Sequence, residues 1–341
     1  MELSTTLEPA TPFVAGQSVV LPQLTPYEDV TPEEPVAHFI EGNSSAITLS
    51  DLTSKCVVPV WGTTNELTIS HQAFIEAVNN AAQTVFSTAT IHEPEIRVSH
   101  AQHGRTPDAL HIPANQLTQS QRTLYYQRMC FCIVLSITDT INGNEAKVVV
   151  GGVRALNNEN LGTRPAPEKF KIFCGWKVSV CSNLCVFGQC FIDKLEALSQ
   201  HEIYAKAVEL FAQFDPLHYR QRLEMLGQVR MTVEDFTHVA GKMRLYEAMN
   251  TQQRNLLGLP NQILGDQVWN AATRGLISNP NFKIGDDSSI SMWQFLNLLT
   301  EACKNSYIDK FLARDVNALE TSYGITAALT GMDTPYKWFI Q

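Results

Sequence analysis

The densest group of chemically capable side chains lies in one short stretch, EIRVSHAQHGRTP. It places Glu95, Arg97, His100, His103 and Arg105 within eleven residues. On a strand that ends in a loop, such groups could act as general acids and bases or bind an anion. The structural alternative is a polar strand end followed by a solvated turn. No HExxH motif or carboxylate pattern joins the histidines, so we assign no catalytic residue here.

A second group combines basic and aromatic side chains from several predicted strands. If those strands join one sheet, one face could be basic and carry aromatic stacking groups, as in proteins that bind single strands. The alternative is an antiparallel sheet with one ordinary solvated face, where lysines routinely oppose apolar residues. The predicted nucleic-acid or anion contacts are Arg97, His100, Arg105, Arg128, Arg154, Asn157, Lys169, Lys171 and Lys177, and the predicted stacking groups are Tyr125, Tyr126 and Phe173.

Cysteines are the obvious candidates for metal ligands. Cys181, Cys185 and Cys190 are spaced nearly as zinc ligands are, and His201 or Cys174 could complete the set. Structural zinc sites, however, usually combine two tight pairs, and this chain has one cluster. Because cysteine is also among the most buried residue types, we predict core positions, no metal site and no cofactor.

Glycines in VVVGGVRALNN do not form a phosphate-binding loop, since neither GxxxxGK[ST] nor GxGxxG is present. Gly151 and Gly152 instead indicate a bulge or a close approach of two backbones within a strand. Arg154 and Asn157 follow directly, which is why both are among the predicted anion contacts.

Strand patterns, turns and a loop position these residues in the first half of the chain. The strand EKFKIFCGWKV alternates, so Phe170 and its neighbours at every second position face inward and the lysines between them face outward. Asn142-Gly143 between two β-rich runs predicts a tight hairpin turn. The stretch 103–114, with glycine and two prolines, predicts a loop.

Helical periodicity dominates after about residue 195. Ser199 and Asp215 are predicted N-caps there, and Thr232 with Asp235 resembles a capping box. Strands followed by helices predict an α+β fold, with an antiparallel or mixed sheet in the first half and a helical second half.

Charge and proline content divide the chain further. Residues 1–47 hold seven acidic residues, six prolines and no Lys or Arg, which predicts a disordered acidic leader. The window 90–177 has ten basic and seven acidic residues and four histidines. We therefore expect a leader over 1–47, a β-rich core over 48–195 and a helical region over 196–341 that packs on the core.

Neither a secretory signal nor an apolar run long enough to span a bilayer is present in the sequence. We accordingly expect a cytoplasmic protein with reduced cysteines and no membrane association.

Long motifs carry a family resemblance. The runs TLYYQRMCFCIVL, VVVGGVRALNNENL and EKFKIFCGWKVSVCSNLCV resemble an uncharacterised Bacteroidota family of unknown function, as do PVWGTTNELTISHQAFIEAV and PEIRVSHAQHGRTP. The segment SMWQFLNLLTEACKNSYIDKFLARDVNAL looks like the W–N–TE segment of the broader phage/plasmid-like protein family. The resemblance covers about 48–341 and departs from the pattern at Trp176-Lys177-Val178-Ser179. It implies a mobile-element context and supplies no catalytic residue.

Three functional hypotheses remain open. The leading one is a non-enzymatic mobile-element accessory protein that binds nucleic acid, single-stranded DNA in particular, or a nucleoprotein complex. The second is a host-modulating or counter-defence protein that binds a host or mobile-element protein through its helical half. The third is an enzyme built on Arg97, His100, His103 and Arg105. Each is compatible with an oligomer.

Overall fold

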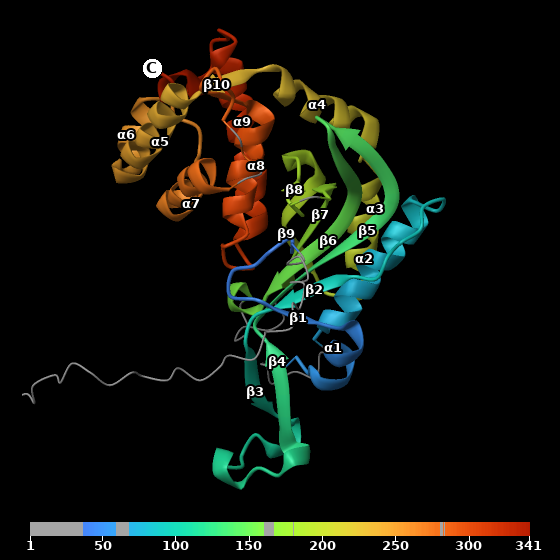
Figure 1. Cartoon of the computed structure of the whole chain (residues 1–341). Coiled ribbons are helices and arrows are strands. Elements are labelled where there is room, and N and C mark those ends of the chain that lie inside the picture. Colours follow the sequence, from blue (N-terminus) through green and yellow to red (C-terminus); the bar gives the residue numbers. More distant parts are fainter. Residues whose placement is uncertain (1–36, 59–67, 160–166, 180, 280–281, 283) are drawn as a thin grey trace, which may run out of the picture. The chain divides into compact units, whose positions relative to one another are not determined.

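The structure is a computed structural model that describes residues 37–58, 68–159, 167–179, 181–279, 282 and 284–341. An antiparallel sheet lies at its centre (Figure 1). In this part of the chain the sheet has seven strands in the order β1-β2-β5-β6-β7-β8, and β9 also pairs with β7. The strands are β1 (Ser45–Ile47), β2 (Glu95–Val98), β5 (Arg128–Ile141), β6 (Asn144–Ala155), β7 (Glu168–Val178), β8 (Leu184–Cys185) and β9 (Phe191–Ala197).

Local sequence signals account for several of these elements. Asn142 and Gly143 have positive φ angles of 48° and 79°, which the tight β5–β6 turn requires, so the predicted hairpin is confirmed. Gly151 lies where a Cβ atom would come within 2.2 Å of the Phe131 carbonyl oxygen. The predicted close approach of two backbones is therefore confirmed as well.

Helices follow the sheet in the chain and also flank it. The described helices are α1 (Leu49–Lys55), α2 (His71–Val85), α3 (Gln200–Ala212), α4 (Pro216–Gln228), α5 (Val233–Ala248), α6 (Thr251–Leu256), α7 (Gly265–Ser278), α8 (Met292–Cys303) and α9 (Phe311–Leu329). The predicted caps are confirmed: the side chains of Ser199, Asp215 and Thr232 each accept a hydrogen bond from a backbone N–H in the first turn. The α+β prediction is confirmed too.

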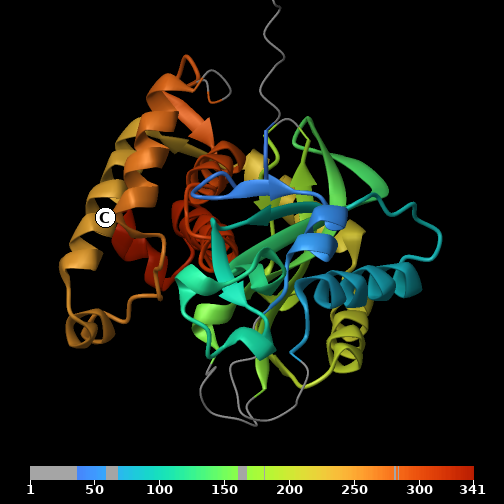
Figure 2. The same ribbon diagram turned by 90° about the horizontal axis from the view of Figure 1, so that it is seen from below.

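One face of the sheet packs against α2 and α3, which lie on the opposite side from α8 and α9 (Figure 2). Phe170, Ile172, Cys174 and Trp176 of β7 point into this main core and are at most 1% exposed. The inward face predicted from the alternation of β7 is confirmed.

The other face of the sheet is covered rather than solvated. Ile308 and the first two residues of α9, Phe311 and Leu312, pack on it, and Phe39 and Ile40 add to the same cluster. This second cluster buries the sheet side chains Cys130, Cys132, Val149 and Phe173. Cys130 and Cys132 are core residues, as predicted, whereas Cys181 is only partly buried. The solvated basic face that the sequence suggested does not form.

The folded chain starts earlier than expected. Phe39 and Ile40 are at most 1% exposed and β1 begins at Ser45, although the predicted leader extends to residue 47. Residues 1–36 lie outside the described part. Residues Ala37–Gln341 form one compact unit, and none of its described helices is both long and apolar enough to cross a membrane.

Candidate anion-binding site at the β3–β4 hairpin

A two-stranded hairpin leaves the sheet and extends away from it (Figure 1). Its strands are β3 (Ala101–Arg105) and β4 (Arg122–Tyr126), which pair in antiparallel register with Arg105 opposite Arg122. The loop predicted to begin at His103 is therefore a strand up to Arg105. Sequence reasoning missed it because its pairing partner lies beyond a long connection that contains two prolines.

The hairpin continues two strands of the sheet. β2 runs into β3 across Ser99 and His100, and β4 runs into β5 across Gln127. At this bend the Ser99 N–H donates to the Arg128 carbonyl oxygen at 2.9 Å, and the Arg128 N–H donates to Ser99 Oγ at 3.2 Å. These two bonds link the strands where the ladder is interrupted, and they help to fix the direction of the hairpin.

The base of the hairpin is anchored on the residues that follow α1 and on a small apolar cluster. The Val57 N–H donates to the Leu124 carbonyl oxygen at 2.8 Å. Tyr125 packs with Val58 and Leu156 and is 8% exposed. The predicted stacking residue Tyr125 is therefore an anchor of the hairpin and not an exposed platform.

Basic side chains share one face of this hairpin. Alternation along the strands puts Arg105, His103 and Arg122 on the same face, and Lys55 lies beside it at the end of α1. These four residues line a cavity of about 710 Å³, and no Asp or Glu is among the described residues that line it.

The positive charges of Arg105 and Arg122 are not balanced by negative charges on this face of the hairpin. Like charges directly opposite across an antiparallel pair destabilise it. Among the described residues, Arg105 donates to the main-chain carbonyl oxygens of Leu110, at 3.4 Å, and of Ile112, and these uncharged acceptors leave its charge uncompensated. Arg122 is exposed and has no ion-pair partner among the described residues. A bound anion would supply the missing negative charge.

Among the four basic residues that line the cavity, Lys55 has its charge partly balanced by an ion pair. Its Nζ lies 2.6 Å from Asp51 Oδ1, and this hydrogen bond raises the pKa of the lysine. Such an exposed pair contributes little free energy, so it can exchange for contact with a ligand. Tyr126 lies on the same hairpin face nearer the sheet, half-buried, and burial raises the pKa of its phenol.

Most of the other predicted contacts lie on the covered face of the sheet, where they are engaged. Arg97 is 7% exposed and donates to Ser44 Oγ and to the Ser44 carbonyl oxygen, both at 3.1 Å. Arg128 Nε lies 3.0 Å from Asp309 Oδ1. These side chains hold the N-terminal and C-terminal segments onto the sheet.

The lysines of β7 are engaged in a similar way. Lys171 pairs with Asp193 at 2.7 Å, and Lys177 pairs with Glu95 at 3.1 Å. Lys169 lies opposite Glu196 across the β7–β9 ladder. Together they do not form a positive surface.

Two predicted contacts are corrected by burial. Arg154 has no exposed surface and lies on the opposite face from the other basic residues, because its register partner is Phe170. It pairs with Glu159 at 3.1 Å and with Glu168 at 2.6 Å. Phe173 is also fully buried, so it cannot stack on a base.

The enzyme hypothesis required Arg97, His100, His103 and Arg105 to converge, and they do not. Arg97 is buried in the sheet, His100 is exposed at the bend, and only His103 and Arg105 line the hairpin cavity. Asn157 is exposed in a short turn after β6. Among the described residues, no three His, Cys, Asp or Glu side chains are grouped so as to hold a metal ion.

Two residues of the hairpin face were missed in the sequence. Lys55 is about 50 residues from the hairpin in the chain and only the fold brings it there. Arg122 had a usable signal, since it precedes the alternating run TLYY, but its meaning depends on the pairing with Arg105.

Comparison with known proteins identifies the family without assigning a role to any of these residues. Neither the curated proteins nor the solved structures contain a match. One family model matches residues 24–340, nearly the whole chain. The chain belongs to the family described as "Domain of unknown function, B. Theta Gene description (DUF3871)".

Proposed function

We propose that this protein binds nucleic acid through the basic face of the β3–β4 hairpin, with single-stranded DNA as the first ligand to test. The observation that carries the proposal is the direct opposition of Arg105 and Arg122 with no acidic residue in the described lining of their cavity. Guanidinium groups bind phosphate oxygens in a bidentate geometry, and a pair of them suits a polyanionic backbone.

This site replaces the basic sheet face as the location of binding. Arg122 and Lys55 join Arg105 and His103 as proposed phosphate contacts, and the half-buried ring of Tyr126 on the same face could contact a base. We assign no catalytic step to this site. The resemblance of the C-terminal segment to phage/plasmid-like proteins supports the further proposal that the protein is an accessory of a mobile element.

The test is a fluorescence-anisotropy titration of a labelled single-stranded oligonucleotide at several salt concentrations. Arg122→Gln should weaken binding and reduce the slope of log K against log salt by about 0.7 for each lost phosphate contact. The matched control is Arg274→Gln, because Arg274 is an exposed arginine on α7, far from the hairpin in the chain.

A second titration tests whether the acidic leader affects DNA binding. Residues 1–36 carry six acidic side chains that could compete with DNA for the hairpin. A full-length variant with these six residues changed to Gln or Asn should bind more tightly. The proposal is wrong if neither form binds at concentrations on the order of tens of micromolar at low salt, or if Arg274→Gln weakens binding as much as Arg122→Gln.

A second candidate function is protein binding by the helical half. Large apolar side chains are exposed there, notably Leu256, 86% exposed at the end of α6, and Ile277, 80% exposed on α7. A partner recovered from nuclease-treated host extract should be lost with Leu256→Ser. It should be retained with Leu110→Ser, which changes an exposed leucine outside that half. Equal recovery with both variants would count against this candidate.

A further inference from the structure

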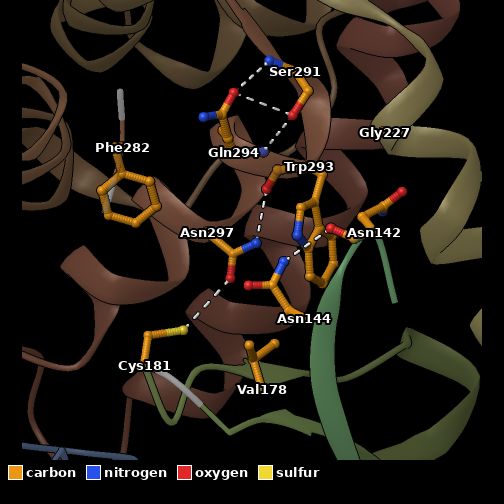
Figure 3. A pocket seen from close by; sticks show the side chains of 10 residues that line it. All are labelled: Asn142, Asn144, Val178, Cys181, Gly227, Phe282, Ser291, Trp293, Gln294 and Asn297. Atoms are coloured by element: carbon orange, nitrogen blue, oxygen red, sulfur yellow. Dashed lines mark hydrogen bonds between the residues drawn. The ribbon is translucent and has the colours of Figure 1, made fainter. Parts of the chain in front are cut away.

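A second cavity, of about 380 Å³, lies where the β5–β6 turn meets the helical half (Figure 3). The turn contributes Asn142 and Asn144, the end of α4 contributes Gly227, and the first turns of α8 contribute Trp293 and Asn297. Its volume lies in the range of about 300–1,000 Å³ that is usual for small-molecule sites.

The lining is polar and carries no formal charge. No Asp, Glu, Lys or Arg is among the described residues around the cavity, and the polar groups are mainly carboxamides. A charged ligand would therefore lose its hydration there without gaining a counter-charge. The cavity suits an uncharged molecule that offers hydrogen-bonding groups.

Most carboxamides of the cavity are fixed by the protein. Asn142 Nδ2 donates to the Leu223 carbonyl oxygen at 2.9 Å, and Asn144 Nδ2 donates to the Asn142 carbonyl oxygen at 3.0 Å. Asn297 Nδ2 donates to the Trp293 carbonyl oxygen at 2.8 Å, while its Oδ1 accepts from Asn183 Nδ2 at 3.2 Å. These bonds hold the side chains in place without a ligand.

Two kinds of hydrogen-bonding group are left over. Asn144 Oδ1 is an acceptor and Trp293 Nε1 is a donor, and neither has a hydrogen-bond partner among the described residues. The Trp293 and Phe282 rings supply aromatic surface on different sides of the cavity (Figure 3). An acceptor, a donor and aromatic walls match a flat ring with an amide-like edge.

We infer that this cavity binds an uncharged planar heterocycle of the nucleobase type, free or as a nucleoside. The heterocycle donates an N–H to Asn144 Oδ1, accepts from Trp293 Nε1 and packs against the aromatic rings. The inference is independent of the hairpin, because a nucleoside has no phosphate for Arg122 to bind.

A substitution at Gly227 tests whether the shape of the cavity matters for binding. A Cβ atom at this position would lie 2.0 Å from Asn142 Oδ1, so Gly227→Ala must displace the Asn142 side chain. Gly241 is the matched control, since it also lies inside a helix and a Cβ atom there would meet nothing within 4 Å. Trp293→Phe removes the donor while keeping an aromatic ring.

The experiment measures binding of the four common nucleosides to the full-length protein by saturation-transfer NMR and calorimetry, with glucose and galactose as comparison ligands. At least one nucleoside should bind saturably, with a Kd of about 1 mM or tighter. Gly227→Ala or Trp293→Phe should weaken it about tenfold or more, whereas Gly241→Ala and Arg122→Gln should not.

Three results would overturn the inference. One is the absence of saturable binding by every nucleoside, and another is binding of a hexose in preference to all of them. The third is unchanged nucleoside affinity in both Gly227→Ala and Trp293→Phe. Thermal unfolding identifies a variant that fails to fold, in which case the other variant decides.

Discussion

Replacing Arg154 by methionine should strongly destabilise the protein. Arg154 is fully buried, contacts Glu159 and Glu168, and donates to the Ile69 carbonyl oxygen. The Glu168 carboxylate also accepts from the Ile69 N–H at 3.1 Å. The arginine thus joins β6, β7 and the residues that precede α2, so its removal should weaken all of these attachments.

The magnitude follows from the burial of the ion pairs. Removing one partner of a buried pair costs about 3–5 kcal/mol because the other charge is left uncompensated. In Arg154→Met two carboxylates lose their cation, while the side-chain volume is largely kept over the Phe170 ring, which lies 4.9 Å from the guanidinium carbon. We expect a loss of about 3–5 kcal/mol in the free energy of unfolding, out of a total of about 5–15 kcal/mol.

Urea unfolding followed by circular dichroism measures the loss. The matched control is Arg122→Met, which removes an exposed arginine and should change the free energy of unfolding by at most about 0.5 kcal/mol. A further change of Glu159 and Glu168 to glutamine should recover part of the loss.

A small effect would refute this reasoning. If Arg154→Met lost less than about 1 kcal/mol relative to Arg122→Met, the buried network would not be the attachment described here. If it instead remained stable and bound DNA more weakly, Arg154 would be a nucleic-acid contact after all, as its sequence context first suggested.

Three further predictions concern buried groups. Burial, together with the charge of Arg154, lowers the pKa of His71 from 6.5 to about 3. Between these two pH values the histidine is protonated in the unfolded chain and neutral in the folded protein. The contribution of His71 to the free energy of unfolding should therefore fall by about 1.4 kcal/mol per pH unit as the pH drops from 6.5 towards 3, so urea titrations of His71→Gln should show a shallower fall than those of the wild type. Burial raises the pKa of Asp315 well above 3.8, so the contribution of this side chain to the free energy of unfolding should fall as the pH rises above 3.8. Asp315→Asn should lack this fall and be more stable at about pH 8 in the same assay. Gly151→Ala should lower the free energy of unfolding by about 1–3 kcal/mol or more because of the clash with the Phe131 carbonyl oxygen, whereas Gly241→Ala should not lower it.

Local signals in the sequence were sufficient for the individual elements. The Asn142-Gly143 turn, the caps at Ser199 and Asp215 and the alternation of β7 all depend on neighbouring residues, and all are as predicted. These features follow from backbone φ angles and helix N–H groups, which nearby side chains determine.

The candidate site depended on contacts that no local pattern contains. The opposition of Arg105 and Arg122 requires the register of a hairpin whose connection spans 106–121. The face on which Arg154 lies depends on its pairing with Phe170, and the cover over Phe173 comes from residues more than 130 positions away on either side in the chain. Charge spacing alone could not distinguish a positive surface from side chains that are each paired within the fold.

The late cover over the second face of the sheet has a consequence during synthesis. Phe39 and Ile40 are made first, the strands next, and Ile308, Phe311 and Val316 last. At about 5–20 residues per second, roughly 7–26 s separate the synthesis of Val186 from that of Val316. Throughout this interval Cys130, Val149 and Phe173 lack the cover that Ile308, Phe311 and Val316 provide. We therefore expect chaperones at the ribosome to bind this apolar surface until the last helix emerges.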